Sequence, residues 1–171
     1  MPERARGSAQ AVTGDTIMLG DDGEVHLDGV LAPRGRSETL GAPFAREARE
    51  GLSRLLAEHE VSVRPIAAGA GRDGNMRAHV VRDDGLWLQA ELVKQGWARA
   101  ALSADSAAFG DELLAQERAA RAAGRGLWVL ETYAVRDGAD VERLNRDVGS
   151  FQIIAGTITN TARRGDDIYL N

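Results

Sequence analysis

Residues 11–33 read AVTGDTIMLGDDGEVHLDGVLAP, and this stretch decides the fold. Two short runs with strand character, Thr16–Leu19 and Glu24–Val30, flank the turn Gly20-Asp21-Asp22-Gly23. Asp-Gly readily adopts the positive φ angles that tight hairpin turns require, so these runs are predicted to pair. A further strand over Ala9–Val12 makes the first third of the chain a three-stranded meander.

Helices and two more strands are predicted downstream of the meander. The strongest helix spans Pro43–Glu58, because its apolar residues recur at helical spacing on one face. The remaining elements, in chain order, are a strand over Glu60–Ile66, in which Pro65 marks the end or an edge position, a glycine-containing loop over Ala67–Met76, a strand over Arg77–Val81, and helices over Leu88–Gln95 and Phe109–Ala123. This order predicts a mainly β fold with α, in which a five-stranded OB-type barrel carries three flanking helices.

The last forty residues have a different character. Residues 131–150 are polar and are interpreted as a linker with a short helix around Val141–Arg146. Residues 151–171 are predicted to form a β-hairpin, with strands over Phe151–Asn160 and Asp167–Leu170. An isolated two-stranded hairpin is marginally stable in water, so this one is expected to pack on the barrel or to begin a second domain. The barrel domain itself is expected over residues 7–130.

Composition limits the possible functions. The chain has 171 residues and no cysteine, which excludes disulfides, thiolate metal sites and a cysteine nucleophile. Its net charge of −5 argues against strong nonspecific binding to nucleic acid. Only Lys94 among the 21 basic residues is lysine, and a GC-rich coding sequence explains this bias more simply than phosphate recognition does.

Targeting signals are not evident in the sequence. No run approaches the roughly 18 apolar residues of a membrane helix, so a soluble protein without membrane insertion is expected. The first eight residues contain no apolar segment of a secretory signal peptide. The compartment stays open, and export remains compatible with a longer precursor.

Four motifs in order resemble the thermonuclease family of staphylococcal-nuclease-like domains. The first is Gly14-Asp15-Thr16, and the second is His26–Arg34, where the family has R-x-x-G-[IV]-D-[AT]-P-E. The third is the segment Leu86–Ala98, and the fourth is Arg125-Gly126-Leu127-Trp128. The resemblance extends from about Gly7 to Trp128 and implies the barrel fold described above.

The resemblance also implies a chemistry, calcium-dependent hydrolysis of phosphodiesters, but the matching positions have changed. Asp15 matches the first calcium carboxylate of the family, whereas Leu31 stands at the second and cannot ligate. Arg34 replaces the catalytic glutamate, and the two catalytic arginines fall on His26 and Asn75. The active site is therefore interpreted as degenerate, and no cofactor is expected; calcium would be required only by residual nuclease activity.

The same substitutions favour a different use of the cleft that contains the active site in the family fold. Arginines concentrate in the two loops that border it in the family fold, and they could form a phosphate-binding site without metal. The candidates are Arg34, Arg36, Arg72 and Arg77. His26 and Asp28 share a strand face and could also pair as an imidazole–carboxylate couple or form a rebuilt metal site, although surface pairing without function is favoured.

Three functions follow from this reading. The first is an inactive domain that binds nucleic-acid phosphate or a protein partner. The second is a weak or altered calcium-dependent phosphodiesterase that uses Asp15. The third is a structural adaptor, in which the barrel supports a domain that begins with residues 151–171.

Overall fold

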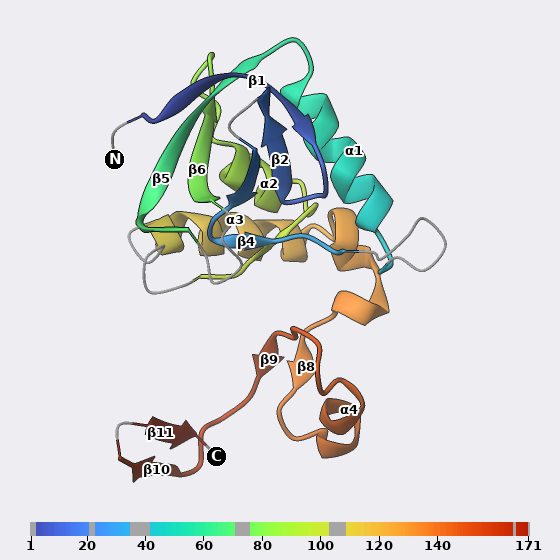
Figure 1. Ribbon diagram of the computed structural model, residues 1–171. Coiled ribbons are helices and arrows are strands. Elements are labelled where there is room, and N and C mark those ends of the chain that lie inside the picture. Colours follow the sequence, from blue (N-terminus) through green and yellow to red (C-terminus); the bar gives the residue numbers. More distant parts are fainter. Residues whose placement is uncertain are drawn as a thin grey trace. The chain divides into compact units, whose positions relative to one another are not determined.

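The barrel predicted from the sequence is confirmed. The computed structural model describes residues 3–20, 23–34, 42–70, 76–102, 109–165 and 167–170. Five strands close into a barrel in the order β1-β2-β3-β6-β5 (Figure 1). They are β1 (Ala5–Ala11), β2 (Thr16–Leu19), β3 (Glu24–Leu27), β5 (Glu60–Ala70) and β6 (Met76–Arg82). Within the barrel, β3 and β6 pair in parallel, and the other four pairings are antiparallel.

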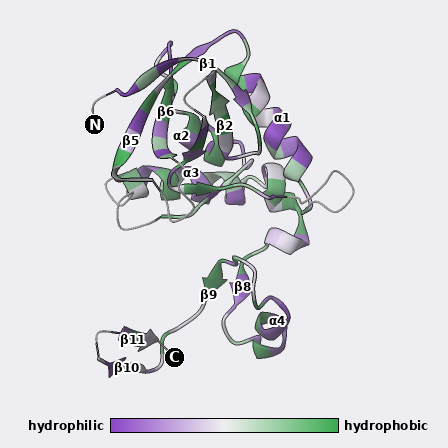
Figure 2. Cartoon of the chain, in the orientation of Figure 1, coloured by the Kyte–Doolittle hydropathy of each residue, from purple (hydrophilic) through white to green (hydrophobic). Residues whose placement is uncertain are grey.

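Three helices accompany the barrel and lie within two residues of their predicted bounds. They are α1 (Ala45–Leu56), α2 (Leu88–Lys94) and α3 (Gly110–Ala122). Residues Ala48, Leu52 and Leu56 of α1 are buried, whereas hydrophilic residues recur along the same helix in Figure 2. Pro43 was expected in the first turn of this helix, but α1 begins only after Phe44, whose φ of 71° is left-handed.

Two strand predictions were wrong at their ends, and the two errors have different causes. The expected strand Glu24–Val30 stops at Leu27, because Gly29 turns the chain with a φ of 80°. The residues beyond that turn form β4 (Val30–Leu31), which pairs with β7 (Arg99–Ala100) outside the barrel. Strand β5 does not end at Pro65 but continues to Ala70 through a register shift, the kind of irregularity at which a strand tolerates proline.

The core of the barrel is apolar and continuous. Each large side chain buried here stabilises the fold by about 1.5–3 kcal/mol relative to an exposed one. The fully buried members contributed by the strands and helices include Ile17, Val25, Leu52, Val61, Val63, Val80, Leu88, Leu92 and Leu113. None of the helices among the described residues is long and apolar enough to cross a membrane.

One histidine is buried in an aromatic cluster beside this core. The ring of His79 on β6 lies 4.6 Å from the ring of Phe109 and 5.5 Å from the ring of Trp87, centroid to centroid. Only 4% of His79 is exposed, and neither ring nitrogen has a hydrogen-bond partner among the described residues. Burial lowers the pKa of His79, and the negative charge of Asp28 opposes this effect. The neutral imidazole is therefore the form that the fold accommodates.

The chain divides into two compact units, Met1–Val129 and Leu130–Asn171. The second unit contains a 3₁₀ turn (Glu131–Tyr133), β8 (Arg136–Asp137), α4 (Val141–Arg146), β9 (Ile154–Ala155), β10 (Thr161–Arg164) and β11 (Asp167–Leu170). The predicted C-terminal hairpin is present, but its first strand is β10 and not Phe151–Asn160. Gly165 has a φ of 60° and allows a tight turn between Arg164 and Asp167. The first strand of the hairpin therefore lies closer to the C-terminus than predicted.

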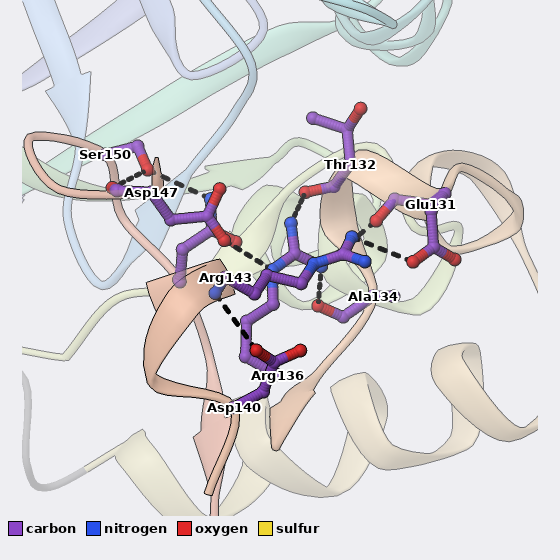
Figure 3. A network of polar contacts seen from close by, with 9 residues as sticks. Glu131, Thr132, Ala134, Arg136, Asp140, Arg143, Asp147 and Ser150 are labelled. Atoms are coloured by element: carbon purple, nitrogen blue, oxygen red, sulfur yellow. Dashed lines mark hydrogen bonds and ion pairs between the residues drawn. The ribbon is translucent and has the colours of Figure 1, made fainter. Parts of the chain in front are cut away.

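Polar contacts are prominent in the second unit, where Tyr133 is the one buried apolar side chain among the described residues. Figure 2 shows apolar β9 in green, yet both of its residues are exposed. Arg136 is 4% exposed, and its guanidinium donates to the backbone carbonyl oxygens of Glu131, Thr132 and Ala134 (Figure 3). Its Nε also donates to Asp147 Oδ2 at 2.6 Å. One guanidinium thus ties the 3₁₀ turn to the end of α4.

Replacing Arg136 with methionine should open the second unit and leave the barrel folded. The variant removes every donor of this network, and each lost hydrogen bond to a charged group costs about 1.5–3 kcal/mol. Limited proteolysis should then cleave within residues 130–171, whereas thermal melting followed by tryptophan fluorescence should not change, because all three tryptophans lie in the first unit. Arg143→Met, which removes a partly exposed ion pair with Glu131, is the matched control and should resist proteolysis. Equal sensitivity of the two variants would contradict this account.

Replacing His79 with phenylalanine should make the stability of the barrel less dependent on pH. The unfolded chain takes up a proton at histidine near pH 6.5, but the folded chain does so only at lower pH. As the pH falls below 6.5, wild type should therefore lose free energy of unfolding relative to the variant. Urea denaturation at about pH 7.5 and about pH 5.5 measures this difference. The other titrating groups, including Glu117, are common to both proteins and cancel; parallel pH profiles would show that His79 is not buried in the neutral form.

Candidate functional site

A cleft of about 170 Å³ opens where β3 passes into β4. We call it the barrel cleft. Its lining includes His26, Asp28, Leu31, Arg34 and Arg77. Four of these five residues are site positions or members of a possible pair predicted from the sequence, and the resemblance to the family places Leu31 at the second calcium carboxylate. The β-sheet register brings His26 and Arg77 side by side, because β3 and β6 pair in parallel at these residues.

Asp15 lies next to this cleft at the turn between β1 and β2. Gly14 is needed there, since a Cβ atom at this position would lie 2.7 Å from the Cβ atoms of both Ala32 and Ala48. The carboxylate of Asp15 accepts hydrogen bonds from Thr13 Oγ1 at 2.8 Å and from the backbone N–H of Ala32 at 3.0 Å. Close packing against α1 and two local donors therefore fix the orientation of the carboxylate.

Arg34 completes the surroundings of Asp15 with a two-pronged ion pair. Its Nε donates to Asp15 Oδ1 at 3.2 Å, and its Nη2 donates to Asp15 Oδ2 at 3.1 Å. The side chain of Asp15 is 1% exposed and that of Arg34 is 49% exposed. The arginine thus covers the carboxylate with one edge of its guanidinium and presents the rest to the cleft. Such parallel pairing is the strongest arrangement available to these two side chains.

These contacts do not fit a calcium site. Calcium requires six to eight oxygen ligands, several of them from carboxylates. At the family's ligand positions this chain offers Asp15 and an aliphatic Leu31, and both oxygens of Asp15 already accept hydrogen bonds from Arg34. A cation bound there would have to displace a guanidinium that carries the same sign of charge.

Asp28 and Arg77 form a second, looser pair in the cleft. Arg77 Nη1 lies 3.6 Å from Asp28 Oδ1, which is beyond hydrogen-bond distance. The side chain of Asp28 is 1% exposed and that of Arg77 is 47% exposed. Neither carboxylate oxygen of Asp28 has a hydrogen-bond partner among the described residues. The sequence suggested an Asp28 couple with His26; Arg77 is the residue with which Asp28 forms an ion pair here.

Two of the four predicted phosphate-binding arginines therefore meet at one cleft. Arg34 and Arg77 both line it, from the segment after β4 and from β6. Arg36, Arg72 and Asn75 lie outside the described residues. Sequence reasoning did not find the Asp15–Arg34 pair. The available signal was a charge reversal at the position of the family's glutamate, close in the fold to a retained aspartate.

One other group of side chains, among the residues the structure describes, has the spacing of a metal site. His59, Asp83 and Asp84 lie together near the start of β5. His59 Nδ1 lies 2.8 Å from Asp83 Oδ1, and this contact lowers the pKa of Asp83. Both oxygens of Asp84 bind the guanidinium of Arg82, which lowers the pKa of Asp84 still further. Because Arg82 already neutralises Asp84, this group is explained as an exposed ion-pair network.

Comparison with known protein families agrees with the fold. Residues 24–130 match the family described as Staphylococcal nuclease homologue. The match begins at the first residue of β3, so it includes His26, Asp28, Arg34 and Arg77, and Asp15 precedes it. A comparison with curated proteins found no match. Because the family match spans more than half of the chain, this protein belongs to the staphylococcal nuclease homologues.

Proposed function

We propose that this domain is a non-catalytic staphylococcal nuclease homologue that binds a phosphate group of nucleic acid in the barrel cleft without metal. The observation that carries the proposal is the two-pronged ion pair of Arg34 with Asp15. In this arrangement an internal guanidinium supplies the positive charge that a bound cation supplies in the family. The domain has a cleft with a positive group within it, but it lacks the means to activate water.

The loss of several reactive groups argues against catalysis. The resemblance to the family places Arg34 at the position of the catalytic glutamate, and it places His26 and Asn75 at the positions of the two catalytic arginines. Removal of one preorganised stabilising group typically lowers the rate by about 10²- to 10³-fold. Changes at several such positions together would lower the rate of phosphodiester hydrolysis too far for the domain to act as a nuclease.

The electrostatics of the cleft favour a single anionic group. Each arginine has a buried carboxylate behind it and is half exposed in front, so the positive ends face the opening. The two pairs are neutral in sum, and the chain as a whole has a net charge of −5. Binding must therefore come from directed hydrogen bonds within the cleft and not from a long-range positive field. We infer weak, local recognition of one phosphate.

Calcium should not stabilise the wild-type domain but should stabilise a variant with the family's carboxylates. In Leu31→Asp/Arg34→Glu, three carboxylates surround the cleft position that Arg34 now fills. If about 10 mM CaCl₂ is tenfold above the dissociation constant, binding adds about 1.4 kcal/mol, or a melting temperature higher by about 4 °C. Arg34→Gln, which removes the ion pair without adding a carboxylate, is the control. Calcium stabilisation of wild type that disappears in Asp15→Asn would overturn the proposal.

Adenosine 3′,5′-bisphosphate should bind wild type in EDTA, and added salt should weaken the binding. Arg77→Gln removes charge-assisted hydrogen bonds to the ligand and should lower the affinity by about tenfold. Arg46→Gln removes the same charge from the exposed face of α1 and should have little effect. Isothermal titration calorimetry measures both variants. Absence of binding to wild type would refute phosphate recognition and would point to a protein partner.

A further inference from the structure

Asp28 differs from Asp15, the other buried aspartate described near the cleft. Its two oxygens are inaccessible to solvent and accept no hydrogen bond from a described residue. Asp15, by contrast, accepts hydrogen bonds from Thr13, Ala32 and Arg34. Buried polar groups without partners are rare because each one loses its contact with water and gains nothing in return. The unsatisfied carboxylate of Asp28 therefore requires an explanation.

The backbone around Asp28 is fixed, so the carboxylate cannot leave this position easily. The N–H of Asp28 donates to the carbonyl oxygen of Ala78 at 3.0 Å. The side-chain amide of Gln89 on α2 donates to the same Ala78 oxygen at 2.8 Å and lies 3.5 Å from the carbonyl oxygen of Asp28. Gln89 is itself fully buried. The carboxylate is held in the wall of the cleft with Arg77 as its charged neighbour.

Arg77 lies beside Asp28 without hydrogen bonding to it. At 3.6 Å the guanidinium supplies charge but no donor to the carboxylate, and nearly half of its side chain is exposed. An anion in the cleft would attract this guanidinium away from Asp28. A ligand that offers an anion alone would then leave a bare carboxylate, whereas a ligand with a hydroxyl beside its anion could satisfy both groups.

We propose that Asp28 accepts a hydrogen bond from a ribose hydroxyl next to the phosphate that Arg77 binds, so that the cleft favours ribonucleotides over deoxyribonucleotides. This inference rests on the proposed function and adds a specificity-determining residue to it. The 2′-hydroxyl is the group by which proteins distinguish RNA from DNA at a given site. The cleft volume of about 170 Å³ suits a phosphate with its sugar, because pockets for whole small molecules begin at about 300 Å³. A metal cation is disfavoured as the partner of Asp28, since Arg34 and Arg77 both line the same cleft.

The test compares three ligands on unmodified protein in EDTA. They are adenosine 3′,5′-bisphosphate, its 2′-deoxy analogue and its 2′-O-methyl analogue, of which only the first has the hydroxyl donor. The first should bind about tenfold more tightly than either analogue, as expected for one hydrogen bond to a charged acceptor. Equal affinities, or tight binding of the 2′-O-methyl analogue, would overturn the role of Asp28 and leave the phosphate site intact. No binding of any ligand would overturn the proposed function itself.

Two variants then test whether Asp28 causes the preference for ribose over deoxyribose. Asp28→Leu has a similar shape and no acceptor, and its ratio of ribose to deoxyribose affinity should fall to about one. The ratio is measured within one protein, so a general loss of affinity or stability does not imitate this result. Glu24→Gln removes the same charge from an exposed position of β3, the strand that ends just before Asp28, and should keep the wild-type ratio. A wild-type ratio in Asp28→Leu would overturn the assignment.

Discussion

A carboxylate taken out of water needs a positive charge beside it, and in this barrel Arg34 provides that charge for Asp15. The pair joins the β1–β2 turn to the segment after β4, which are 19 residues apart in sequence. Gly14 and Ala32 allow α1 to pack directly behind the carboxylate. A site that binds a soluble cation is empty when the cation is absent, but a guanidinium on the same chain cannot dissociate. The charge at this end of the barrel is therefore a permanent part of the fold.

The carboxylates of Asp15 and Asp28 are neutralised in different ways. As a result, one arginine of the site is held by hydrogen bonds to its carboxylate and the other is not. Asp15 accepts directed hydrogen bonds, so Arg34 is held in one orientation. Asp28 receives only charge from Arg77, so that guanidinium keeps its donors for another acceptor. Because buried ion pairs add little net stability, the Asp28–Arg77 arrangement is poorly explained as a device for holding the barrel together. A pair that is electrically balanced but unsatisfied in hydrogen bonds supports the proposed binding site instead.

The sequence predicted what depends on local pattern and missed what depends on pairing in space. Thr16–Leu19 and the three helices follow from periodicity and turn residues, and their positions agree closely with β2, α1, α2 and α3. The end of the strand at Pro65 was predicted wrongly, because the effect of this proline depends on a register shift against β6, which no local sequence rule contains. Arg34 was recognised as a charge reversal, yet its contact with Asp15 became visible only when the β1–β2 turn and the end of β4 came together.

Arginine performs a related task in the second unit, where Tyr133 is the one buried apolar side chain among the described residues. Arg136 binds three backbone carbonyls and one carboxylate with a single planar group. A lysine ammonium could not reproduce either arrangement, because it lacks the rigid fork that meets two acceptors side by side. Arginine is therefore the better cation at positions 34 and 136, in a chain that has one lysine among its 21 basic residues. Biased coding composition can account for the number of arginines, but the contacts of Arg34 and Arg136 require the guanidinium itself.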